Sequence, residues 1–134
     1  MKTLYSKEDN SANFVLDNGQ ECRYVERDNY FIIYLSSHSG CNQACRFCHL
    51  TQTKQTNMVQ ATFDDYLLQA QTVLDHWTKN KAILVKPEKI HVNFMARGEP
   101  LDNPILVRLW GQLSKDMDSM IKKATNVEQV KFKI

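Results

Sequence analysis

The sequence predicts an α/β fold in which a β-hairpin precedes about two and a half βα units. Three observations support this prediction. An Asn-Gly pair separates two strand-like runs near the N-terminus, short apolar runs alternate with long segments of helical periodicity, and the 134 residues fit one domain. Because consecutive strands are joined through helices, we expect these strands to pair in parallel with right-handed crossovers.

The predicted hairpin lies in the N-terminal region. The runs Phe14–Leu16 and Glu21–Glu26 flank the pair Asn18 and Gly19, which tolerate the positive φ angles of a tight turn. Residues 1–12 are polar, and we expect them to be poorly ordered unless another part of the chain holds them.

The first strand of the βα units is predicted at Tyr30–Leu35. This run is short, apolar and rich in β-branched and aromatic residues, which is typical of a strand buried on both faces. The polar residues 36–56 follow without periodicity. Connections of that length without regular structure are usually functional.

The first predicted helix runs from Thr62 to about Asn80. Thr62 with Asp65 three residues later resembles a capping box, with Asp in place of the usual Glu. Its apolar residues recur at helical spacing and are Phe63, Tyr66, Leu67, Ala70, Leu74 and Trp77.

A strand, a helix and a final strand complete the predicted order. The second strand is Ile90–Met95. Asn103 is expected to cap the next helix, with Pro104 in the first turn, where a missing N–H costs nothing. The alternating apolar and basic residues of Val127–Ile134 predict a third strand.

Composition excludes several classes of protein. The net charge of +2 is too balanced to predict nucleic-acid binding from electrostatics alone, although it leaves an RNA substrate open. No apolar run approaches the roughly 18 residues of a membrane span, and the N-terminus lacks the apolar segment of a signal peptide. We therefore expect a cytoplasmic protein with no membrane partner.

Three of the four cysteines form a tight motif. Cys41, Cys45 and Cys48 have the spacing Cys-x3-Cys-x2-Cys. In a reducing compartment, clustered thiols indicate metal or cluster ligands rather than disulfides. Three thiolates on one loop can hold a [4Fe-4S] cubane and leave one iron open for a small molecule. The alternative is a zinc site with Cys22 or His49 as a fourth ligand, although no second Cys-x2-Cys pair is present.

A second motif follows the second predicted strand. Gly98 allows close approach of the backbone to a ligand, Glu99 can accept a hydrogen bond from an ammonium group, and Pro100 stiffens the turn. Both motifs come directly after predicted parallel strands. If these strands are adjacent, both loops lie at the edge where α/β barrels carry their chemistry. Without that context, the second motif would be an ordinary polar turn.

The cysteine motif resembles the signature of the radical S-adenosylmethionine (radical SAM) superfamily, including Phe47 just before the last cysteine. Gly98, Glu99 and Pro100 resemble the segment that holds the methionine amino group there. The resemblance implies a partial (β/α) barrel of radical SAM type at residues 29–134, after an extension with the hairpin at 1–28. It also implies a [4Fe-4S] cluster, S-adenosylmethionine and an external one-electron reductant. The reaction would be reductive cleavage to a 5′-deoxyadenosyl radical.

The residues around the two motifs are most similar to the subfamily that methylates an adenine in ribosomal and transfer RNA. The resemblance covers about residues 13–134 and implies RNA base modification. Two features depart from that subfamily. Tyr34 stands seven residues before Cys41, where the subfamily has a catalytic cysteine, and the chain has no cysteine far downstream. Cys22 occupies neither place and is expected to be a half-buried strand residue.

The resemblance covers the N-terminal half of such a core. The third strand would leave a sheet edge unpaired, which predicts a complementary C-terminal half or a homo-oligomer as partner. The alternatives to a radical SAM enzyme are a zinc- or cluster-binding module without catalysis, an electron carrier with a fourth cluster ligand, and the inactive half of a split enzyme.

Overall fold

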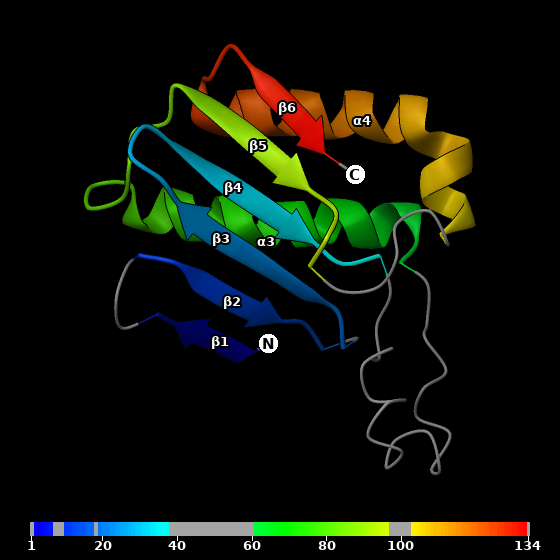
Figure 1. Ribbon diagram of the computed structural model, residues 1–134, viewed down its shortest axis with the longest axis horizontal. Helices are drawn as coiled ribbons and strands as arrows, with labels where there is room; N and C mark the ends of the chain where they lie inside the picture. The colour runs from blue at the N-terminus through cyan, green and yellow to red at the C-terminus, as the bar shows by residue number, and fades with distance from the viewer. Residues whose placement is uncertain (1, 7–9, 18, 38–60, 97–102, 134) are drawn as a thin grey trace.

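A computed structural model of the chain describes residues 2–6, 10–17, 19–37, 61–96 and 103–133. In this part of the chain, six strands form one sheet in the order β1-β2-β3-β4-β5-β6 (Figure 1). The strands are β1 (Lys2–Tyr5), β2 (Ala12–Val15), β3 (Glu21–Glu26), β4 (Tyr30–Leu35), β5 (Lys89–Asn93) and β6 (Val130–Lys133). The helices are α3 (Phe63–Asn80) and α4 (Pro104–Thr125).

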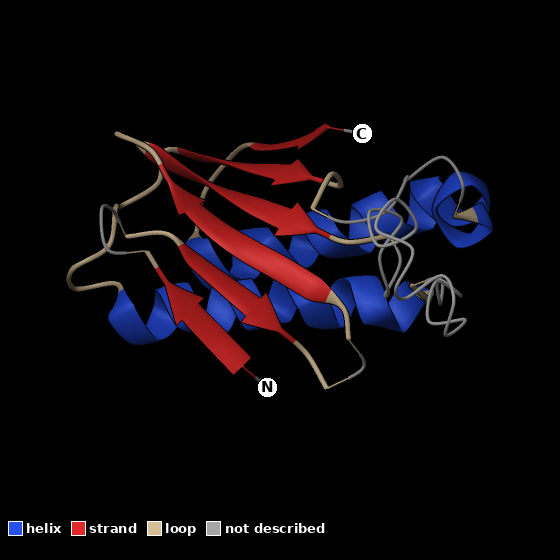
Figure 2. Cartoon of the chain, turned by 60° about the horizontal axis from the view of Figure 1, so that its bottom comes forward, coloured by secondary structure: helices blue, strands red, loops and turns tan. Residues whose placement is uncertain are grey.

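The sheet is mixed, and both helices lie on one of its faces. Strands β1 to β4 pair antiparallel, whereas β4, β5 and β6 pair in parallel. Figure 2 shows α3 and α4 side by side beneath the sheet, with no helix of the described residues on the other face. The predicted parallel pairing of the three later strands is therefore confirmed.

The predicted partial (β/α) barrel of radical SAM type is wrong, because the strands form an open sheet with two helices. The physical reason lies at β4. Strand β3 pairs antiparallel with β4, with Cys22 opposite Leu35, and takes the edge of β4 that β5 leaves free. The hairpin thus extends the sheet instead of standing before a barrel. The division of the chain between residues 28 and 29 stays a prediction.

The hairpin itself is confirmed as β2 and β3. Gly19 has a φ of 84°, a value that favours glycine, and the amide of Leu16 donates to the carbonyl of Gln20 at 2.8 Å. The N-terminus differs from expectation, because β1 pairs with β2 in the region predicted to be poorly ordered. Its residues carry no alternating apolar pattern, so backbone pairing to an available strand edge decides this element.

Burial of β4 is uneven between its two faces, not complete on both as predicted, although Ile32 on the face away from the helices is also buried. Phe31, Ile33 and Leu35 face the helices and are fully buried, whereas Tyr30 and Tyr34 on the other face are half-buried. The alternation of side chains along a strand explains the difference, because the described helices α3 and α4 both cover the same face of the sheet.

Local capping signals in the sequence correctly located the start of each helix. In α3, the Thr62 hydroxyl accepts from the amide of Asp65 at 3.1 Å, and the Asp65 carboxylate accepts from the amide of Thr62 at 2.9 Å. In α4, Asn103 is the N-cap and Pro104 occupies the first turn. Both helices therefore begin where predicted.

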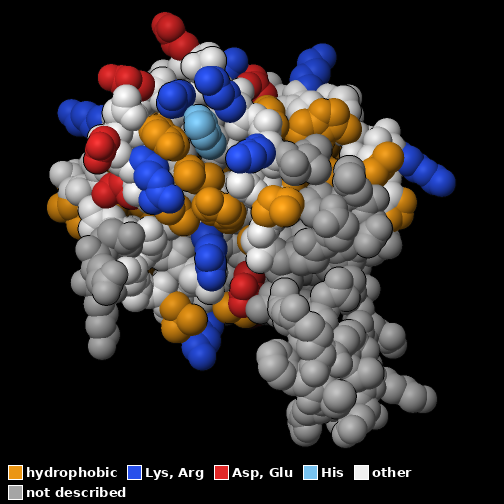
Figure 3. Space-filling view, in the orientation of Figure 1, with side chains coloured by type: hydrophobic (Ala, Val, Ile, Leu, Met, Phe, Trp, Pro, Cys, Tyr) orange, Lys and Arg blue, Asp and Glu red, His pale blue; other side chains and the backbone are white. Residues whose placement is uncertain are grey.

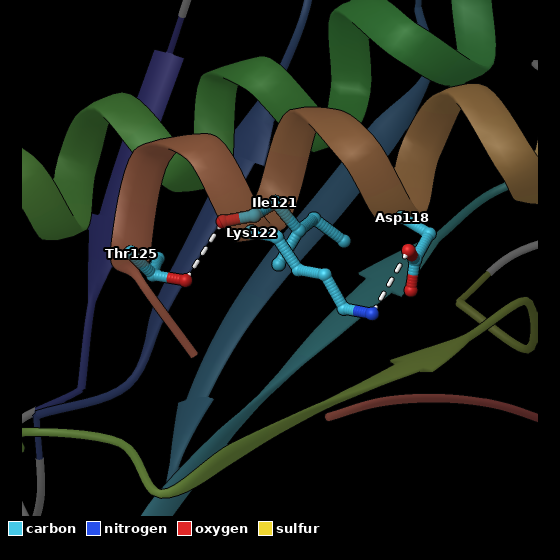
Figure 4. Close-up of polar contacts among 4 residues, drawn as sticks. All are labelled: Asp118, Ile121, Lys122 and Thr125. Atoms are coloured by element: carbon cyan, nitrogen blue, oxygen red, sulfur yellow. Dashed lines mark hydrogen bonds and ion pairs between the residues drawn. The ribbon is translucent and has the colours of Figure 1, made fainter. Parts of the chain in front are cut away.

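The C-terminal end of α4 is closed by short-range polar contacts (Figure 4). The Thr125 hydroxyl donates to the carbonyl of Ile121 at 2.7 Å, and Lys122 forms an ion pair with Asp118 at 3.2 Å. Asn126 then adopts a left-handed conformation with a φ of 60°, which ends the helix.

The core lies between the sheet and the two helices. Trp110 of α4 contacts Phe94 and Phe132 edge-on, each with ring centroids 5.5 Å apart, so α4 covers one side of β6. No helix in the described ranges is long and apolar enough to cross a membrane.

Candidate functional site

The candidate site is built on the edge where β4 and β5 end. The two strands are adjacent and parallel, with Ile33 opposite Val92 and Tyr34 opposite Asn93. The amide of Ala96 donates to the carbonyl of Leu35 at 3.1 Å, so the chain leaving β5 stays against the end of β4. The segments that carry the two motifs both start from this edge.

The predicted site residues themselves lie outside the described residues, in segments 38–60 and 97–102. They are Cys41, Cys45, Phe47, Cys48, Gly98, Glu99 and Pro100. Their arrangement stays a prediction. Among the residues that the structure does describe, no group of three or more His, Cys, Asp or Glu could hold a metal ion.

The ends of the cysteine segment are joined to each other. The amide of Ala61 donates to the carbonyl of Ser37 at 2.9 Å. Ser37 and Ala61 are both fully buried, so the two points where segment 38–60 leaves and re-enters the described chain lie side by side in the core.

Asn103 connects the bases of both segments. Its side-chain amide donates to the carbonyl of Ser37 at 2.8 Å and to that of Ala61 at 3.0 Å. Its side-chain oxygen accepts from the amides of Ile105 at 2.9 Å and Leu106 at 3.2 Å, which caps α4. One fully buried side chain thus holds both ends of segment 38–60 against the residue that follows segment 97–102.

A second buried amide supports the same region from α3. Gln69 accepts from the amide of Ser36 at 2.7 Å and donates to the Ser36 carbonyl at 2.9 Å. It also donates to the side-chain oxygen of Gln20 at 3.0 Å, and Gln20 donates to Asp65 at 3.2 Å. Fully satisfied polar groups of this kind hold buried backbone in one arrangement. The turn that leads from β4 into the cysteine segment is therefore anchored on α3 and on the hairpin.

Tyr66 of α3 lies beneath these anchors and packs on Phe94, which follows β5, with ring centroids 5.5 Å apart. Burial raises the pKa of Tyr66 to about 12, although the nearby Ser37 acts in the opposite direction. The phenol is therefore neutral at physiological pH and serves as a packing residue with a polar tip.

Cys22 and Tyr34, the two residues that mark departures from the RNA-methylating subfamily, lie on opposite faces of the sheet. Cys22 points into the helix-covered core and is fully buried, more than the half-burial expected. Burial and the neighbouring Glu21 raise the pKa of Cys22 to about 12, so the thiol stays protonated at neutral pH. Tyr34 lines a hollow on the face opposite α3 and α4. Cys22 therefore cannot substitute for a cysteine at position 34.

The capping role of Asn103 was predicted from the sequence, whereas its two bridging hydrogen bonds and the role of Gln69 were not. Gln69 had a recognisable signal. It is polar, yet it lies three residues after Tyr66 on the apolar side of α3, where an unpartnered amide would be costly. Asn103 gave no such signal, because its amide partners come from distant parts of the chain.

The comparisons with known proteins found one partial similarity. The chain is 30% identical over 84 residues to the dual-specificity RNA methyltransferase RlmN of Bdellovibrio bacteriovorus. The matched region covers 63% of this chain and 19% of that protein, so the chain corresponds to a small part of its relative. No family model matches the chain, and no solved structure matches it either.

Proposed function

We propose that the chain is a radical SAM protein acting on RNA. Cys41, Cys45 and Cys48 would hold a [4Fe-4S] cluster, and Gly98 and Glu99 would hold the amino-acid part of S-adenosylmethionine. When bound and reduced by an external one-electron donor, the cluster supplies the electron that cleaves S-adenosylmethionine to methionine and a 5′-deoxyadenosyl radical. The partial similarity to an RNA methyltransferase supports RNA as the substrate class.

One observation carries this proposal: the residues that bound both motif segments meet at one edge of the sheet. Strands β4 and β5 are parallel neighbours, and Asn103 joins the two ends of the cysteine segment to the start of α4. An edge of this kind brings loops from neighbouring strands together. A cluster and its small-molecule ligand require such convergence, because they share one iron.

The donor set of the chain fits an open cluster better than a closed one. The fourth cysteine, Cys22, is fully buried in β3 with its pKa raised to about 12, so it is a poor source of a fourth thiolate. Three cysteines at close spacing then remain as ligands, which leaves one iron for S-adenosylmethionine.

The remaining motif residues would act on S-adenosylmethionine and its surroundings. Glu99 would accept a hydrogen bond from the ammonium group, Gly98 would present backbone without steric hindrance, and Pro100 would stiffen the turn. Phe47, which directly precedes Cys48, would contribute to binding the cofactor. Because Tyr34 replaces the cysteine of the RNA-methylating subfamily, the proposal covers radical chemistry on RNA and not methyl transfer through that cysteine.

Anaerobic reconstitution tests the proposal. The full chain, supplied with iron, sulfide and a reductant, should become brown, bind about four irons and convert S-adenosylmethionine to 5′-deoxyadenosine. A colourless protein that binds one zinc and forms no 5′-deoxyadenosine would instead identify a structural zinc module.

Glu99→Ala should weaken S-adenosylmethionine binding while the iron content stays unchanged. Loss of one charge-assisted hydrogen bond corresponds to about 1.5–3 kcal/mol. Isothermal titration calorimetry of the reconstituted protein measures the change. Glu128→Ala, which removes an exposed carboxylate before β6, is the matched control and should bind like the unaltered chain. Equal affinities of the Glu99 variant and this control would refute the assigned role.

A further inference from the structure

The face of the sheet opposite α3 and α4, which we call the open face, has an ordered pattern of side chains. Register places its residues in three rows that run across the strands from β3 toward β6. The rows are Arg23-Tyr34-Asn93-Lys133, Val25-Ile32-His91-Lys131 and Arg27-Tyr30-Lys89. Aromatic and neutral residues lie in the middle on β4 and β5, and most of the cations lie at the two sides. Figure 3 looks onto this face and shows Lys and Arg side chains around a hydrophobic patch.

The open face is strongly cationic although the whole chain carries only +2. Among the described residues from β3 to β6, this face has one acidic residue, Glu21, and five basic residues. The five cations are Arg23, Arg27, Lys89, Lys131 and Lys133. Helices α3 and α4, by contrast, carry equal numbers of acidic and basic residues, and there Asp118 pairs with Lys122 (Figure 4). The helix layer is thus balanced in charge, whereas the open face carries an excess of positive charge, which favours an anionic ligand there.

The middle of the open face is aromatic and hollowed. A depression of about 510 Å³ is lined by residues of β4, β5 and β6, among them Tyr30, Tyr34 and His91. The rings of Tyr30 and His91 lie 4.6 Å apart, and the Lys89 ammonium is 5.2 Å from the centre of the Tyr30 ring. Tyr34 is half-buried and lies one row further along, opposite Asn93. Flat rings with exposed area are suitable partners for nucleobases.

The pKa of His91 reflects the positive electrostatic potential of this surface. Burial lowers the pKa of His91, and the positive charges of Lys89, Lys131 and Lys133 lower it further. The imidazole is therefore neutral at physiological pH, and the same positive potential that disfavours imidazolium attracts phosphate groups.

We propose that the open face binds single-stranded RNA, with phosphates against the cations of β3 and β6 and bases over Tyr34 and Tyr30. The choice of RNA rests on the proposed function, whereas the choice of a single strand rests on the surface itself. Aromatic side chains can stack on bases only when these bases are not already stacked inside a duplex. A protein partner fits less well, because covering this face would bury several unpaired lysines around the small apolar area of Val25 and Ile32.

Fluorescence anisotropy with a labelled single-stranded RNA of about 12 nucleotides tests the charge pattern. The double variant Lys131→Glu/Lys133→Glu should bind at least about tenfold more weakly at low salt, because two phosphate contacts become repulsive. The slope of log K against log salt should become shallower by about 1.4, which is the single-strand value for two contacts. The matched control, Lys115→Glu/Lys123→Glu, makes the same change of charge on exposed residues of α4 and should keep both affinity and slope.

Tyr34→Leu tests the aromatic contact separately from charge. Leucine keeps an apolar side chain on β4 but removes the ring, so affinity should fall about five- to hundredfold with an unchanged salt slope. Tyr5→Leu, a substitution of an exposed tyrosine on β1, is the control and should bind like the unaltered chain. Circular dichroism of each variant verifies that the sheet is retained.

The outcomes separate this inference from the proposed function, because RNA binding is measured without S-adenosylmethionine and the cleavage assay without RNA. Equal binding by the sheet-face and helix-face double variants would overturn the open face as the RNA surface, even if 5′-deoxyadenosine is formed. Tighter binding of duplex than of single-stranded RNA would overturn the single-strand assignment. Loss of RNA binding in the sheet-face variant with full cleavage activity is the expected result.

Discussion

Alanine at any one of Cys41, Cys45 and Cys48 is expected to leave the reconstituted protein without a stable [4Fe-4S] cluster and without formation of 5′-deoxyadenosine. Each thiolate would hold one iron, and three ligands are the minimum for a cubane that keeps one iron open. With two cysteines left, the cluster has no third protein anchor. Iron and sulfide analysis, visible absorption and chromatography of the reaction products measure the loss.

Cys22→Ala is the control for this series. Cys22 is fully buried on the helix-covered face, and its raised pKa keeps the thiol protonated, so its removal should leave iron content and cleavage intact. A small loss of stability from the missing sulfur is expected. If the Cys22 variant loses as much iron as the other three, the site is a closed four-cysteine centre and the proposed function is wrong.

Asn103→Ala is expected to destabilise the protein by about 2–4 kcal/mol. The substitution removes the α4 cap, which contributes about 1 kcal/mol, and leaves the buried carbonyl of Ala61 without its donor, which costs about 1–3 kcal/mol. The carbonyl of Ser37 is affected less, because it keeps the amide of Ala61 as a partner. Chemical denaturation followed by circular dichroism measures the change in the free energy of unfolding.

Asn103→Ser separates the two roles of the side chain. Serine keeps an oxygen that can cap α4 but has no amide to reach Ser37 and Ala61, so it should recover only the contribution of the cap. Faster hydrogen exchange at the amide of Ala61 is expected in both variants, because the base of the cysteine segment loses a bridge. If the free energy of unfolding of Asn103→Ala lies within about 0.5 kcal/mol of that of the unaltered chain, the hydrogen bonds from Asn103 to Ser37 and Ala61 do not contribute to stability.

Sequence reasoning worked for elements that depend on neighbouring residues. The capping box of Thr62 and Asp65, the cap of Asn103 with Pro104, and the turn at Gly19 are local hydrogen-bond and φ preferences, and the structure contains all three. The three later strands were also located, because their apolar patterns persist over several residues. The parallel pairing of these strands was predicted because a helix connects each strand to the next.

Prediction from the sequence failed for features whose pairing or hydrogen-bond partners come from distant parts of the chain. Strand β1 exists because its backbone pairs with the edge of β2, and nothing in its side chains announces this. The barrel prediction failed for the same reason, since the sequence does not say that β3 takes the free edge of β4. The bridge from Asn103 to Ser37 spans 66 positions and is likewise invisible in a local pattern.

The sequence by itself determined the order of hairpin, later strands and helices and the start of each helix, and it predicts the chemistry of the two motifs. These features depend on residue types and short spacings that the chain carries in any conformation. Only the tertiary structure decided that the sheet is open and mixed, that Asn103 joins the bases of both motif segments, and that five cations surround an aromatic centre on one face. Strand pairing and side-chain convergence are set by which edges and faces meet after collapse, and this selection is not encoded in any single stretch of residues.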